Sequence, residues 1–286
     1  MLRSGASGGY TIVETMIFLA VTSLLFVAAM TAIGGKQASV QFAQATHDAQ
    51  SQIQRVINEV STGYYPSGGS FTCSVGPTPA DIPTFTAVAS LQGSSNDCVF
   101  LGKALQLGTD DVDKETYNVI NMAARRLNVS GKEASSLKEA LPTAIPGITE
   151  SFKLQFGLSV TRVVKSGSPT QYGTIIFLST LPKFQGNTGT LASGTQRVSY
   201  GAVPSSLLDD DLTTATARAS NLTDIGDLSG RAQIDMTPSK GIIICLADNS
   251  NPANATRKAS ITVGQGASQT SATLTYITPG DVTECP

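Results

Sequence analysis

Residues 10–33, YTIVETMIFLAVTSLLFVAAMTAI, form an almost wholly apolar run that carries a single carboxylate, Glu14, near its start. No charged residue occurs between positions 15 and 33. At about 1.5 Å per residue, a helix over this run is just long enough to cross the roughly 30 Å hydrocarbon layer of a bilayer. The sequence therefore predicts a membrane segment.

A secretory signal peptide is the alternative interpretation of the run, because LFVAA ends in small residues that resemble a cleavage site after Ala29. Three features fit it poorly. Arg3 is remote from the apolar run, Gly8 and Gly9 interrupt the leader, and Glu14 would lie at the start of the apolar core. A membrane helix is the better interpretation.

The position of Glu14 has a local explanation and a functional one. Thr11 and Glu14 have the T-x-x-E spacing of a helix capping box, which places the carboxylate at the positive end of the helix. Capping does not explain why the helix starts inside an apolar run, where an ionised carboxylate costs at least about 2.5 to 3.5 kcal/mol. If the chain were cut after Gly9, the new α-ammonium of Tyr10 would provide an opposite charge at the same depth.

These residues resemble the class III signal of type IV prepilins and pseudopilins. The likeness consists of a short polar leader ending in glycine, MLRSGASGG at residues 1–9, then an aromatic residue, then Glu at the fifth position counted from that aromatic residue, then a long apolar segment. The resemblance implies that a prepilin peptidase cleaves between Gly9 and Tyr10 and N-methylates Tyr10. It also implies that Glu14 serves filament assembly by setting the register of subunits.

The resemblance further implies partners and a location. The partners would be other pilin subunits in a helical homo- or heteropolymer, the prepilin peptidase and an inner-membrane assembly platform. The chain would cross the cytoplasmic membrane once before assembly, and afterwards it would belong to an extracellular pilus or the cell surface.

The helix is expected to continue beyond the membrane, through residues 34–62. This stretch lacks Pro, and after residue 35 it contains no Gly until Gly63. Apolar side chains at i, i+3, i+4 and i+7 predict one buried stripe, formed by Ile53, Val56, Ile57 and Val60. His47 also falls on this helix, and we interpret it as a solvated or packed side chain because no suitable metal-binding partner is near it in the sequence.

Residues 63–286 are expected to form a β-rich globular head. GYYPSGG at residues 63–69 has the turn chemistry that ends a helix. Residues 98–107, 172–181 and 240–248 have the composition of buried strands, and residues 260–277 alternate around a Gly-containing turn as a hairpin does. The predicted class is α+β with a largely antiparallel sheet, similar to the heads of H-type pseudopilins and minor pilins.

A segment rich in helix formers interrupts these strands and predicts a helical insertion at about residues 110–141. Arg125 and Arg126 could contact DNA phosphates, but two arginines on a helix usually belong to a solvated face, and we expect them to lie on one here. SGKE within this segment is not a phosphate-binding loop, because the first glycine of that motif is missing. The run of Asp209, Asp210 and Asp211 lacks calcium-loop spacing and predicts a solvated loop or a helix cap.

The cysteines indicate an oxidising compartment. Cys73, Cys98, Cys245 and Cys285 form an even set without CxxC spacing, and the chain of 286 residues contains one histidine. Two disulfides are therefore a better interpretation than a metal site. Three pairings are possible, and we favour the sequence neighbours, Cys73 with Cys98 and Cys245 with Cys285.

The composition and motifs favour a structural role. With 14% charged residues and a formal net charge of -2, the chain has no global charge that would attract nucleic acid or anionic lipid. The one GxSxG match, GASGG at residues 5–9, lies in the polar leader, no HExxH occurs and no carboxylate pair stands out, so we expect neither an enzyme nor a cofactor. The leading hypothesis is a filament subunit, possibly a minor one. The alternatives are a monomeric, single-pass anchored binding protein and, less favoured, a secreted hydrolase.

Overall fold

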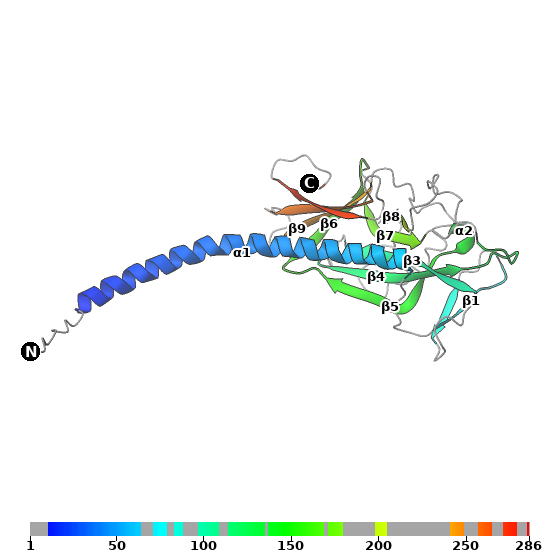
Figure 1. Cartoon of the computed structure of the whole chain (residues 1–286), viewed down its shortest axis with the longest axis horizontal. Coiled ribbons are helices and arrows are strands. Elements are labelled where there is room, and N and C mark those ends of the chain that lie inside the picture. Colours follow the sequence, from blue (N-terminus) through cyan, green and yellow to red (C-terminus); the bar gives the residue numbers. More distant parts are fainter. Residues whose placement is uncertain are drawn as a thin grey trace, which may run out of the picture. The chain divides into compact units, whose positions relative to one another are not determined.

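A computed structural model describes residues 11–63, 71–78, 83–87, 97–108, 114–134, 137–168, 171–179, 198–204, 241–248, 257–264, 271–278 and 285. In these residues a long apolar N-terminal helix is followed by antiparallel sheets, which confirms the predicted α+β class (Figure 1). The chain divides into two compact units, Met1–Gln44 and Ala45–Pro286.

Helix α1, Ile12–Thr62, has the predicted extent and the predicted signals at both ends. The hydroxyl of Thr11 accepts a hydrogen bond from the backbone N–H of Glu14 at 3.3 Å, as an N-cap does. At the other end, the N–H of Gly63 bonds to the carbonyl of Val60 at 3.2 Å. Gly63 has a φ of 68°, a left-handed conformation that glycine adopts at helix ends without strain.

The strands form two larger sheets and one hairpin, and every pairing among the described strands is antiparallel. One sheet has the order β5-β4-β3-β7-β8 and the other β11-β10-β9-β6. The hairpin joins β1 (Phe71–Ser74) and β2 (Thr84–Ala87). The remaining bounds are β3 Cys98–Leu107, β4 Thr116–Arg125, β5 Thr143–Lys153, β6 Leu158–Lys165, β7 Tyr172–Ser179, β8 Val198–Pro204, β9 Ile242–Asp248, β10 Lys258–Val263 and β11 Ala272–Ile277.

Three predicted strands and the hairpin are confirmed. The segments at residues 98–107, 172–181 and 240–248 correspond to β3, β7 and β9, all of them largely buried. The predicted hairpin consists of β10 and β11, with Val263 opposite Ala272 next to the turn. Apolar runs of this length identified strands that are covered on both faces.

Both favoured disulfides are present. Cys73 pairs with Cys98 across a Cα–Cα distance of 6.0 Å, and Cys245 pairs with Cys285 across 5.4 Å. The first ties the hairpin strand β1 to β3, and the second ties the chain end to β9. Each can stabilise the head by roughly 3 kcal/mol by restricting the unfolded chain.

The predicted helical insertion at about residues 110–141 is wrong. Strand β4 occupies Thr116–Arg125, and the only described helix in this region is α2, Leu137–Ala140. Strand β4 lies between β3 and β5, bonded on both sides and buried along nearly its whole length. Helix propensity amounts to tenths of a kcal/mol per residue, so two ladders of backbone hydrogen bonds and burial of Val119 and Ile120 outweigh it.

The expectation for the two arginines is half wrong. Arg126 is exposed as expected, whereas Arg125 is buried at the end of β4 with 3% of its surface accessible. Its guanidinium donates to the carbonyls of Gly76 at 3.0 Å and Thr78 at 3.3 Å. Arg125 therefore holds the segment after β1 against the end of β4.

The predicted apolar stripe of α1 is confirmed, since Ile53, Val56, Ile57 and Val60 are all buried in the unit Ala45–Pro286. Val60 has no accessible surface. Val40, on the same helix, is 66% exposed. The two valines allow the same chemical change to be made in contrasting surroundings.

We expect Val60→Ala to lower the free energy of unfolding of the head by about 2 kcal/mol, because it removes buried methyl groups and leaves a cavity. Val40→Ala should change it by less than about 0.5 kcal/mol. Chemical denaturation of the two purified variants beside the wild type measures both values. Equal effects would contradict the packing of residues 53–60 against the sheets.

Candidate functional site

The first candidate site is the exposed apolar surface at the start of α1. Residues Ile12–Met30 have a mean hydropathy of 2.2, and the structure buries none of this window. Phe18 and Leu24 expose 68% and 72% of their surface. By length and composition this segment can cross a membrane, and a signal sequence near an N-terminus has the same properties. Together with the two disulfides, it indicates a membrane or extracytoplasmic location.

The threonine hydroxyls within this surface are satisfied inside the helix. Thr15 donates to the carbonyl of Ile12 at 2.8 Å, and Thr22 donates to the carbonyls of Phe18 at 2.9 Å and Leu19 at 3.1 Å. A hydroxyl bonded to its own helix enters an apolar environment at low cost. These threonines therefore do not prevent the segment from lying in lipid or against other apolar helices.

Glu14 differs from these threonines. Its backbone N–H takes part in the cap, while the side-chain carboxylate has no ion pair or hydrogen bond with any residue that the structure describes. Gly9 and Tyr10, the predicted cleavage and methylation positions, lie outside the described residues. The sequence of the window Ile12–Met30 contains one ionisable group, the carboxylate of Glu14.

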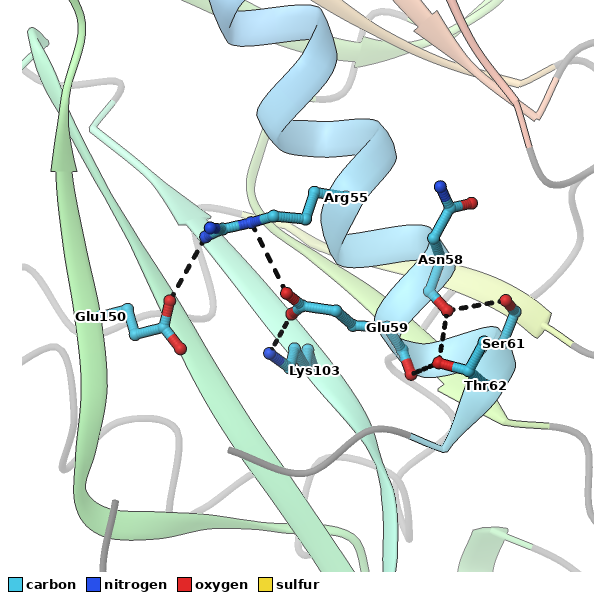
Figure 2. Close-up of polar contacts among 7 residues, drawn as sticks. All are labelled: Arg55, Asn58, Glu59, Ser61, Thr62, Lys103 and Glu150. Atoms are coloured by element: carbon cyan, nitrogen blue, oxygen red, sulfur yellow. Dashed lines mark hydrogen bonds and ion pairs between the residues drawn. The ribbon is translucent and has the colours of Figure 1, made fainter. Parts of the chain in front are cut away.

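The second candidate site is a cluster of charged residues where the end of α1 meets the five-stranded sheet (Figure 2). Arg55 Nε is 3.5 Å from Glu59 Oε1, and its terminal nitrogen is 3.4 Å from Glu150 Oε2 on β5. Lys103, in the middle of β3, binds the other oxygen of Glu59. We call Arg55, Glu59, Lys103 and Glu150 the helix–sheet charge cluster. It links α1 to two strands of one sheet.

Glutamines on α1 bind the other sheet at its edge. Strand β11 is the outermost strand of the four-stranded sheet. Gln50 donates to the carbonyl of Ala272 at 2.8 Å, and Gln54 accepts from the N–H of the same residue at 2.9 Å. The helix therefore satisfies backbone groups at the start of a sheet edge that would otherwise be open to pairing with another chain.

A shallow groove follows the polar side of the second half of α1. It is lined by His47, Gln50, Ser51, Gln54, Arg55, Asn58, Glu59 and Thr62. His47 is exposed, as expected, with its ring 6.3 Å from that of Tyr276 in an edge-to-face arrangement. No group of three His, Cys, Asp or Glu side chains that could hold a metal occurs among the described residues. Asp209, Asp210 and Asp211 lie outside them.

Sequence reasoning missed the helix–sheet charge cluster. A signal was present, because Lys103 interrupts CVFLGKALQL, a segment otherwise typical of a buried strand. A lysine in such a strand needs an acidic partner nearby. The partner, Glu59, is far away in the sequence and on another element, so the pair could not be assigned without the fold.

Comparisons of the chain with models of protein families, with curated protein sequences and with solved structures find no match.

Tyr117 on β4 connects the charge cluster to the core. Its ring stacks on Phe152, with the centroids 5.3 Å apart, and the guanidinium of Arg55 lies 5.1 Å from the centroid of Phe152. Burial raises the pKa of Tyr117 to about 12, although the positive charge of Arg55 acts in the opposite direction. The folded head therefore strongly favours the neutral phenol.

We expect alkaline pH to destabilise the head partly through this tyrosine. In the unfolded chain Tyr117 loses its proton near pH 10.0, and in the folded head near pH 12, so the folded state binds more protons in between. Stability is then complete below pH 10 and falls toward pH 12, by roughly 2 kcal/mol from this group. Tyr117→Phe should flatten this part of the pH profile, measured by denaturation at a series of pH values. Parallel profiles for wild type and variant would contradict it.

Proposed function

We propose that the chain is a structural subunit of a type IV pilus or a related secretion filament. In this proposal the chain is cleaved after Gly9, N-methylated at Tyr10 and polymerised through α1. The observation that carries the proposal is the apolar window Ile12–Met30, which is unburied and contains one carboxylate, Glu14, in its first turn. The leader at residues 1–9 supports it independently.

Two kinds of surroundings can cover this apolar window. Apolar surface of this extent is stable in lipid or against other apolar surfaces. Lipid suits the window before assembly, because the threonine hydroxyls are already bonded within the helix. A bundle of identical helices suits it afterwards, because each helix presents the same apolar surface to its neighbours.

Glu14 favours the bundle over lipid as the final environment. A carboxylate buried in hydrocarbon without a partner is costly and usually marks function. After cleavage, each copy would carry an α-ammonium on Tyr10 close to the depth of Glu14. In a staggered array the ammonium of one copy can pair with the carboxylate of the next, so that each copy both gives and receives one ion pair. That pairing fixes the axial register of subunits.

The proposed function implies particular partners and a sequence of steps from the membrane to the polymer. The chain would be held in the cytoplasmic membrane by residues 12–30, processed by a membrane peptidase, and extracted by an assembly platform into a polymer with further copies or related subunits. Its head, held by two disulfides, would face an oxidising exterior. Neither a cofactor nor catalysis enters this role.

Substitution of Glu14 tests the proposal. We expect Glu14→Ala to insert in the membrane and fold its head normally, yet to fail in assembly, because the neighbouring ammonium would be buried without an opposite charge at a cost of several kcal/mol. Glu14→Gln, which has the same shape, should fail as well. The measurement is the ratio of sheared extracellular protein to the membrane pool in cells.

Thr11→Ala is the matched control. It removes the hydroxyl that caps α1 but keeps the carboxylate, so it should fray the helix start by about 1 kcal/mol and leave assembly near the wild-type ratio. If all three variants give wild-type ratios, Glu14 is only a helix cap. The chain would then be better described as a monomeric anchored protein.

A further inference from the structure

Lys103 is in an unusual position for a lysine. It lies in the middle of β3, and none of its surface is accessible. Its ammonium group has three N–H donors, and the only acceptor among the described residues is the carboxylate of Glu59 (Figure 2). A buried ammonium with donors left over is costly. An ion pair alone therefore leaves this site incompletely satisfied.

A carboxamide lies beside this lysine. Asn121 on β4 is directly opposite Lys103 in the register of the β3–β4 pair, and it too has no accessible surface. Residues opposite each other in an antiparallel pair project to the same face, with Cβ atoms about 4.5 to 5.5 Å apart. That face is the one covered by α1, since Lys103 reaches Glu59 there. The fold thus gathers a buried amine and a buried carboxamide beside a carboxylate whose side chain is 19% exposed.

We propose that Lys103 and Asn121 become joined by an intramolecular isopeptide bond, with Glu59 transferring protons. Glu59 first takes a proton from the ammonium and leaves a neutral amine. The amine nitrogen attacks Cγ of Asn121 and forms a C–N bond. The protonated carboxyl relays a proton from the attacking nitrogen to the amide nitrogen, the bond from Cγ to that nitrogen breaks, and ammonia departs. No oxidant or other reactant is required.

The surroundings favour this reaction in three ways. Holding the two groups on adjacent paired strands replaces a bimolecular encounter with an intramolecular one. Exclusion of water protects the new amide from competing hydrolysis. The product is neutral, so the buried ammonium with unsatisfied donors disappears. The ion pair of Lys103 and Glu59 is then the arrangement that precedes the reaction.

The bond would add a covalent link between strands that bear the load when force acts on the head through α1. Strand β3 is already joined to β1 by the disulfide of Cys73 and Cys98. A link from Lys103 to Asn121 would also join β3 to β4, beneath the end of α1. Force transmitted along α1 would then reach strands that cannot separate. The bond itself does not depend on the proposed filament role.

The test is the mass of the full-length protein purified from membranes and measured after reduction. We expect wild type to be lighter, by one molecule of ammonia, than the mass calculated for the chain that begins at its observed N-terminal residue. After trypsin digestion, which would separate β3 from β4 at Lys114, the segments containing Lys103 and Asn121 should remain joined. Wild-type protein at the full sequence mass would overturn the proposal without any variant.

Variants locate the bond and exclude other losses of ammonia. Lys103→Met and Glu59→Gln should restore the full mass, and Asn121→Asp should lose water in place of ammonia. Lys153→Met, at an exposed lysine on β5, and Asn118→Ala, on the opposite face of β4, are matched controls that should keep the deficit. A deficit that persists in Lys103→Met would show cyclisation elsewhere and contradict the assignment.

Discussion

The apolar surface of α1 between Ile12 and Met30 has no cover among the described residues, and this constraint governs what the protein can be. Hydrophobic surface of this extent requires lipid or other apolar helices. The only ionisable group within it, Glu14, is costly to bury in hydrocarbon without a partner of opposite charge. A subunit that passes from membrane to helix bundle, and brings its own ammonium to the carboxylate of its neighbour, meets both requirements with one short segment.

The second half of the same helix obeys a different rule. From Ala45 onward, one side of α1 is apolar and buried, and the other is polar. The polar side reaches both sheets, through Arg55 and Glu59 to the five-stranded sheet and through Gln50 and Gln54 to the edge of the four-stranded one. The helix end is therefore built into the head. A pull or twist applied to this part of the helix is borne by packed strands, disulfides and ion pairs.

Sequence patterns predicted those parts of the fold in which neighbouring residues decide the structure. The second half of the long helix has apolar residues at helical spacing, and the hairpin of residues 260–277 alternates apolar and polar residues. Residues 98–107 form an apolar run typical of a buried strand. Strand β4 was missed because helix formers in and around it obscured the strand preference of Thr116, Tyr117, Val119 and Ile120, and because its pairing with β3 and β5, the neighbouring strands along the chain, cannot be read from its own residues. Lys103 shows the same limit, since its acidic partner lies on another element. Glu14 could be identified from the sequence because the residues that indicate its role, Gly9, Tyr10 and Thr11, lie just before it in the chain.

The mass of the N-terminal peptide of the native protein tests the central claim most directly, because the processing step distinguishes a filament subunit from every other anchored or secreted chain. If the chain is a filament subunit, the native protein begins at Tyr10 and carries one methyl group on its α-amine. A native chain that begins after Ala29, or a functional protein that retains Met1, would contradict it.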